Sequence, residues 1–137
     1  MEFHSNADKV LRQLDKQMQK AVDMIGGIIE SAAKELCPVD TGLLRNSITH
    51  GGAGGKLGAT EYASDDGGTT GQYADANIPA DEGGNKYVVV VGTNVQYAPY
   101  QELGAPNRNV PPSPFLRPAF ENNMETAKTV VETLLKG

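Results

Sequence analysis

The N-terminal third of the sequence carries a long series of apolar residues at helical spacing, and this series constrains the fold most. From about Asn6 to Leu36 the apolar side chains recur at steps of three and four residues, which places them on one stripe of an α-helix. We therefore predict a single helix here, with this stripe buried against the rest of the chain. The stripe consists of Val10, Leu14, Met18, Ala21, Val22, Ile25, Ile28, Ile29, Ala32 and Leu36.

Two features mark the interior and the end of this predicted helix. Gly26 and Gly27 interrupt it. Because a glycine inside a helix costs about 1 kcal/mol relative to alanine, the pair indicates either a kink or a close approach of another backbone. Pro38 disfavours helical geometry at Cys37, so the helix is expected to end near Leu36.

The strongest strand signal lies at 86–93, which contains four consecutive valines. Because its apolar residues do not alternate with polar ones, we expect both faces of this strand to be covered, as in the centre of a sheet. A second strand is expected to start within 47–50. It follows a short helical turn that either Asp40 or Thr41 would cap.

The C-terminal part predicts a short helix, a stiff connector and a final helix. Residues 97–103 can form two helical turns, with Gly104 as a left-handed stop. The connector 105–118 holds five of the eight prolines and is expected to cross a surface in an extended form. Pro118 suits the start of a helix, and a second apolar stripe follows it. That stripe consists of Phe120, Met124, Ala127, Val130, Val131, Leu134 and Leu135.

These elements predict an α+β fold in which the first and last helices pack on a small, mainly antiparallel sheet centred on 87–92. The length of 137 residues fits one domain spanning 1–137. No apolar run approaches the roughly 20 residues of a membrane span, and the N-terminal 13 residues lack the apolar stretch of a signal peptide. We therefore expect a product made in the cytosol, with no membrane partner.

The negative charge of the chain is concentrated in one glycine-rich segment, 51–86, which contains ten of the sixteen glycines. The net charge is -5, but residues 57–85 contain six acidic side chains and no Lys or Arg, so the remainder carries +1. This balance argues against a nucleic-acid-binding surface. The composition predicts a long mobile loop or a weak hairpin. The acidic side chains are those of Glu61, Asp65, Asp66, Asp75, Asp81 and Glu82.

Residue types that commonly carry catalysis or bind metals are sparse. His4 and His50 have no third ligand at a suitable spacing, so both are interpreted as surface residues. The single cysteine, Cys37, is interpreted as a small buried apolar residue rather than a reactive thiol. Residues 51–56 resemble a phosphate-binding loop in composition only, because Leu57 follows the lysine where Ser or Thr is required. We expect no catalytic residue, metal or cofactor.

Two charged residues stand out because they lie within apolar or turn-rich patterns. Arg45 follows a pair of leucines, and Glu102 lies between Tyr100 and Leu103. A hydrogen-bonded ion pair of Glu102 with Arg45 or with Arg117 would fix how the two helical turns meet. The alternative is that Arg45 and Glu102 are independent surface charges.

Three separated strings then carry a family resemblance: CPVDTGLLRNSI at 37–48, VGTNVQYAPYQELG at 91–104 and PPSPFLRPAF at 111–120. In this order they resemble the gene-ten-like tail-component family of long-tailed bacteriophages and prophages, which is encoded among neck and tail-completion genes. The resemblance covers the chain except the acidic segment, and Ala105 stands where the family often has Thr or Ser. The matching positions are Asp40, Thr41, Gly42, Leu44 and Arg45, then Tyr97, Tyr100, Glu102 and Gly104, then Pro114, Phe115, Leu116, Arg117 and Pro118.

This resemblance implies a structural, non-enzymatic virion protein of the head–tail junction, acting as tail terminator, neck or minor tail component. It implies a ring of copies, expected to be a hexamer, assembled in the host cytoplasm beside neck, connector and tail-tube proteins. DNA would pass the lumen without specific binding, since acidic walls repel phosphates within about 10 Å. We expect segment 57–85 to project into this channel or onto the adjoining ring, and the connector with Phe115 either to reach an adjacent subunit or to pack on its own domain.

Two other function classes stay open from the residues alone. A small hydrolase that uses carboxylates such as Asp40 and Glu102 should show a pocket in which those side chains converge. An acidic DNA mimic that inhibits a host nucleic-acid-binding protein should carry its acids on a rigid face rather than on a glycine-rich segment.

Overall fold

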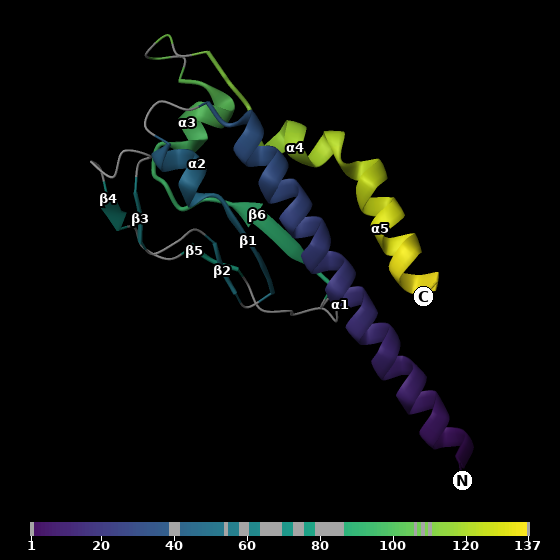
Figure 1. Ribbon diagram of the computed structural model, residues 1–137. Helices are drawn as coiled ribbons and strands as arrows, with labels where there is room; N and C mark the ends of the chain where they lie inside the picture. The colour runs from purple at the N-terminus through teal and green to yellow at the C-terminus, as the bar shows by residue number, and fades with distance from the viewer. Residues whose placement is uncertain are drawn as a thin grey trace.

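The long N-terminal helix organises the molecule, as a computed structural model shows. The structure describes residues 2–38, 42–53, 55–57, 61–63, 70–72, 76–78, 87–105, 107, 109 and 111–136. In Figure 1 helix α1 (Glu2–Leu36) runs diagonally, with strands on one side and helices α4 (Leu116–Asn122) and α5 (Met124–Lys136) on the other. The predicted α+β architecture is confirmed.

Helix α1 is continuous over 35 residues and passes through the glycine pair without a break. Its apolar stripe is buried only in the C-terminal half, at Ala21 and Ile29, and Leu36 at the end of the helix is 44% exposed. Val10 and Leu14, on the same stripe, are 53% and 41% exposed. The expectation that the whole stripe is buried is therefore wrong, because the N-terminal half of α1 extends beyond the rest of the molecule (Figure 1).

The central sheet has two antiparallel strands, β1 (Thr49–Gly52) and β6 (Val89–Gly92), and α1 contacts both of them. Thr49 lies opposite Gly92, and Gly52 lies opposite Val89. The predicted strand is confirmed, but among the described strands β6 pairs with β1 alone and its valines are only half-buried. We expected β6 to lie inside a wider sheet, and this expectation is wrong. Helix α1 packs on the face of β6 that carries Val89 and Val91.

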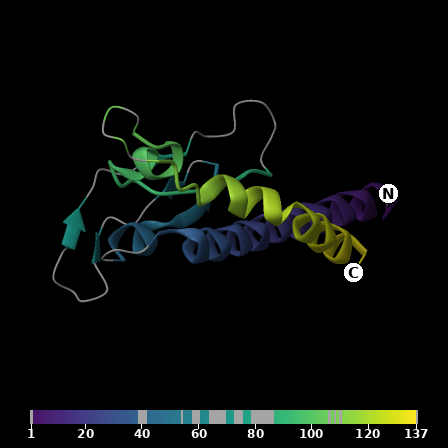
Figure 2. The ribbon, with the colours of Figure 1, turned by 90° about the horizontal axis from the view of Figure 1, so that it is seen from above.

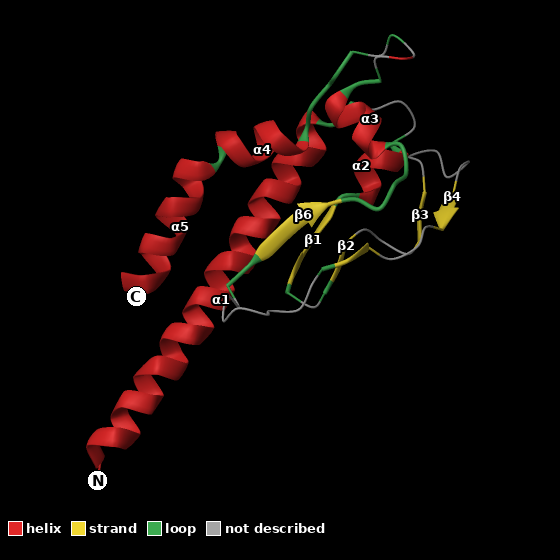
Figure 3. Cartoon of the chain, turned by 180° about the vertical axis from the view of Figure 1, so that it is seen from behind, coloured by secondary structure: helices red, strands yellow, loops and turns green. Residues whose placement is uncertain are grey.

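The glycine-rich segment forms two nested antiparallel pairs in its described residues. Strand β2 (Lys56–Leu57) pairs with β5 (Ala76–Asn77), and β3 (Glu61–Ala63) pairs with β4 (Thr70–Gln72). Figure 3 shows these short strands beyond β1, on the side away from α5. The expected weak hairpin agrees with this pairing. The acidic residues Asp65, Asp66, Asp75, Asp81 and Glu82 lie outside the described residues, as do Asp40 and Thr41.

The core lies where α1 meets α2 (Leu43–Ser47), α3 (Ala98–Leu103) and α4. Phe115 is fully buried there, so its side chain packs on its own domain rather than on an adjacent subunit. The final helix differs from the expectation, since it is divided at Asn123 into α4 and α5 and α5 has no buried residue. Among the described residues, no helix has the length and apolarity that a membrane crossing needs. The core residues are Ile29, Ala33, Cys37, Leu43, Leu44, Ile48, Val95, Ala98, Phe115 and Ala119.

Candidate functional site

The carboxylate of Glu102, on α3, binds the first turn of α4. Its Oε1 accepts hydrogen bonds from the backbone N–H of Phe115 (3.1 Å) and of Leu116 (2.8 Å), and its Oε2 accepts one from that of Arg117 (3.3 Å). The first N–H groups of a helix have no partner within the helix, and Pro118 has no N–H. One carboxylate therefore satisfies the donors at the start of α4, and its charge suits the positive end of that helix.

This contact joins the second and third motif strings and replaces the ion pair considered from sequence. Among the described residues, Glu102 forms no salt bridge with Arg45 or with the guanidinium of Arg117, whose Nε lies 4.0 Å from Glu121 Oε1. The expected pairing partner was therefore wrong, and Glu102 is not an independent surface charge either. One feature of the sequence could have indicated this contact. Pro118 is the third residue of α4, and Phe115, which precedes the helix, has no side chain that can cap it.

The two motif glycines have backbone conformations that favour glycine. Gly42 precedes α2 with φ 85°, and Gly104 ends α3 with φ 82°, both in the region that side chains rarely adopt. The N–H of Gly104 donates to the carbonyl of Tyr100 at 2.8 Å, so Gly104 ends the helix as expected, but its ψ of 170° lies outside the left-handed helical conformation that was predicted. Both glycines thus set the directions in which the motif segments enter and leave their helices.

Sequence reasoning missed a buried hydroxyl pair between the first and second motif strings. Ser47 is fully buried, and its Oγ donates to the carbonyl of Leu44 at 2.6 Å. The same Oγ lies 2.5 Å from Thr93 Oγ1, which also accepts a hydrogen bond from the N–H of Val95 at 3.1 Å. These contacts fix α2 against the segment that leaves β6. Nothing in the local spacing distinguishes Ser47 from an exposed helix-end serine.

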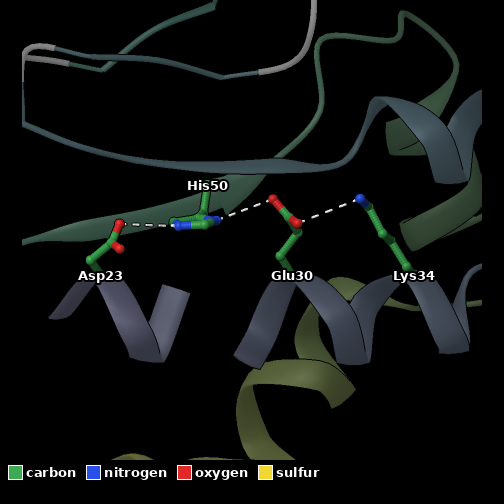
Figure 4. A network of polar contacts seen from close by, with 4 residues as sticks. All are labelled: Asp23, Glu30, Lys34 and His50. Carbon is green, nitrogen blue, oxygen red and sulfur yellow. Dashed lines mark hydrogen bonds and ion pairs between the residues drawn. The ribbon is translucent and has the colours of Figure 1, made fainter. Parts of the chain in front are cut away.

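His50 connects β1 to α1, so its interpretation as a surface residue is wrong. Its side chain is 23% exposed, with Nδ1 3.1 Å from Glu30 Oε1 and Nε2 3.2 Å from Asp23 Oδ1 (Figure 4). Lys34 Nζ in turn lies 3.4 Å from Glu30 Oε2. Both carboxylates only accept hydrogen bonds, and the imidazolium form has a donor for each of them. Asp23 and Glu30 are 27 and 20 residues away from His50 in the sequence, so no local pattern predicted this network.

Gly26 allows the sheet to approach α1 closely. A Cβ atom added at Gly26 would clash with Val89 Cγ2 and would lie 2.7 Å from His50 Cδ2, whereas one added at Gly27 would lie 3.8 Å from His50 Cε1. The structure therefore shows a close approach at Gly26, but it is made by the side chains of Val89 and His50 rather than by another backbone as predicted. The contact fixes the position of β1 and β6 on the helix.

Several motif side chains point outwards. Tyr97 is 41% exposed, Tyr100 is 59% exposed, and the neighbouring Leu103 is exposed as well. Cys37, by contrast, is buried, and burial raises the pKa of its thiol to about 11 despite the opposing effect of Arg45. The prediction that Cys37 is buried is thus confirmed, and the raised pKa of its thiol agrees with the interpretation that it is not a reactive thiol. The motifs combine residues that hold the fold with two exposed tyrosines.

Two cavities lie along α1. One is a groove of about 360 Å³ between α1, β6 and α4, and Arg117 is the charged residue among its described lining residues. The other has a volume of about 500 Å³ beside the C-terminal half of α1, with Glu35 as its charged residue. Among the described residues that line them, neither cavity brings an acid and a base together. Over the residues that the structure describes, no group of three His, Cys, Asp or Glu side chains is arranged to hold a metal.

Comparison with known proteins supplies the classification. A search of curated proteins returned no match, and a search of solved structures also returned no match. A family model described as "Bacteriophage HK97-gp10, putative tail-component" matches residues 1–104. This range includes α1, the sheet and the first two motif strings, while the third string lies beyond it. Because the match spans well over half of the chain, the protein belongs to the HK97 gp10-like tail-component family of bacteriophages.

Proposed function

We propose that this chain is a structural protein of the phage head–tail junction, which completes the tail as a terminator, neck or minor tail component. The observation that carries this proposal is the family match over residues 1–104, which includes the long helix and two of the three motif strings. Membership of a tail-component family implies a location in the virion. The junction is the finer location that the motif resemblance favours.

The protein acts by contacts between subunits rather than by catalysis. The carboxylate that a hydrolase would use, that of Glu102, is committed to three backbone amides at the start of α4. Asp40, its partner in that alternative, lies outside the described residues. A carboxylate with its oxygens bound to backbone N–H groups serves structure, which supports a non-enzymatic role.

Copies of the chain assemble into a ring, with six as the proposed number, beside connector and tail-tube proteins. Apolar side chains that remain exposed on one chain support such self-association, because large exposed apolar surfaces mark interaction sites. The acidic segment 57–85 faces either the DNA channel or the adjoining ring, where its charge keeps the lumen from binding DNA phosphates. The exposed apolar residues of the described helices include Val10, Leu11 and Leu14 on α1, Phe120 on α4, and Met124 and Leu135 on α5.

A deletion in a phage or prophage that encodes this chain tests the role directly. Without the gene, we expect electron micrographs of lysates to show separate heads and tails, or tails of irregular length, and a loss of infectious particles. A plasmid copy of the wild-type gene should restore joined particles, and a copy lacking 57–85 should fold but fail to do so. Normal infectious particles from the full deletion would refute the junction role.

A further inference from the structure

The apolar stripe of α1 continues past the folded body. The C-terminal half of α1 packs against β6, α4 and α5, and the stripe there is buried or half-buried up to Ala32. In the N-terminal half, Val10 and Leu14 of the stripe are 53% and 41% exposed, and Leu11 beside them is 63% exposed. At about 1.5 Å per residue, this half of the helix extends roughly 25 Å. Figure 2 shows it running past the end of α5. Val10, Leu11 and Leu14 thus form an exposed apolar face that continues the partly buried stripe of the same helix.

The same chain carries an uncovered apolar groove. The groove of about 360 Å³ lies between α1, β6 and α4, with the half-exposed ring of Phe120 on its α4 side. Among the described residues that line the groove, Arg117 is the one that carries a charge; its side chain is 70% exposed, and its Nε lies 4.0 Å from Glu121 Oε1. An apolar groove beside two helices is the kind of surface that accepts the apolar face of another helix. The lining residues are Ile25, Ile29, Val89, Val91, Leu116, Arg117 and Phe120.

We propose that the N-terminal half of α1 from one copy docks in the α1–β6–α4 groove of a second copy, with Val10, Leu11 and Leu14 as the inserted side chains. Every copy carries both surfaces of this contact: an exposed apolar face at helical spacing, and a groove whose described lining residues are all apolar except Arg117. A second copy is therefore the occupant for which the structure supplies both surfaces.

The two surfaces lie at different places on one chain, so the contact is head-to-tail. Each copy uses its helix on one neighbour and its groove on another, and such contacts generate a ring when the rotation closes. The inference rests on the proposed assembly role and adds to it the elements that form the contact. It also explains why α1 is longer than its own domain covers.

Sedimentation analysis of four purified chains tests the contact. The wild-type chain should self-associate with increasing concentration. Leu11→Glu, on the helix, and Phe120→Glu, in the groove, should each raise the dissociation constant at least about tenfold. Leu103→Glu is the matched control, because Leu103 is 73% exposed but lies on α3, outside both surfaces. It should associate like the wild type.

A mixture of the two defective variants gives the decisive result. Leu11→Glu retains an intact groove and Phe120→Glu retains an intact helix, so their equimolar mixture should form a 1:1 dimer and nothing larger. A mixture that stays monomeric overturns the proposal, as does a wild-type chain that is monomeric at about 1 mM. The particle assay of the proposed function is independent of either result, because it measures joined virions rather than this contact.

Cross-linking keeps the test valid if a glutamate variant fails to fold. In a Cys37→Ala background, Leu11→Cys and Phe120→Cys chains are mixed and treated with a short bismaleimide. Cross-links between an 11-labelled and a 120-labelled chain are expected, identified by mass spectrometry of the linked peptides. Links of 11 to 11 or 120 to 120 in place of the mixed link would overturn the head-to-tail arrangement.

Discussion

Alanine at Gly26 and at Gly27 should have opposite effects on stability, although the two residues are adjacent on one helix. Each substitution gains about 1 kcal/mol of helix propensity. At Gly27 the new Cβ lies 3.8 Å from His50, an ordinary contact, so Gly27→Ala should stabilise by up to about 1 kcal/mol. At Gly26 the new Cβ would overlap Val89 and crowd His50, so overpacking should cost about 1–3 kcal/mol.

The difference between the two alanine variants isolates the packing contribution, because the gain in helix propensity is common to both. We expect Gly26→Ala to be less stable than Gly27→Ala by about 1–3 kcal/mol. Urea unfolding followed by circular dichroism measures this difference, and thermal unfolding should separate the two midpoints by about 4 °C per kcal/mol.

A double-mutant cycle identifies the atoms responsible. Val89→Ala removes the Cγ2 that the Cβ at Gly26 would meet, so Gly26→Ala should cost less in the Val89→Ala background. The same background should leave the effect of Gly27→Ala unchanged. Equal stabilisation by both glycine substitutions would refute the close-approach account of Gly26.

The remaining predictions concern three single side chains. Glu102→Ala should destabilise the fold by about 1–3 kcal/mol, because the backbone amides that begin α4 lose their acceptor. Glu102→Gln should lose less stability, and an unchanged urea midpoint for the alanine variant would contradict the capping role. Cys37, with a pKa raised to about 11 by burial, should react with a thiol reagent near pH 8 far more slowly in the folded chain than in urea; equal rates would count against its burial. The same raised pKa means that stability should fall between pH 9 and about 11, because the thiol of the unfolded chain has its ordinary pKa of 9.0 and ionises first. His50→Ala should lower stability by about 1 kcal/mol, because the hydrogen bonds of its ring to Glu30 and Asp23 are lost. It should also reduce the destabilisation caused by Gly26→Ala, since the ring of His50 is one of the groups that the new Cβ would crowd. Additive effects of the two substitutions in unfolding experiments would disprove that coupling.

Local patterns in the sequence determined the elements and the family. The three- and four-residue apolar spacing predicted α1, the valine run predicted β6, and Gly104 predicted the end of α3, because periodicity and backbone preference act within a few residues. The motif strings supplied the family, which the match over 1–104 confirms. The burial of Cys37 also followed from its position beside a helix end.

Tertiary structure alone decided which surfaces and partners these elements have. The choice between a kink and a close approach at Gly26 depended on Val89 and His50, which come from distant strands. Glu102 found backbone amides in place of a guanidinium, and half of the α1 stripe stayed exposed. Such outcomes depend on distances between segments that are far apart in the chain. A sequence pattern shows that a helix face is apolar, but it does not show which other element packs against that face.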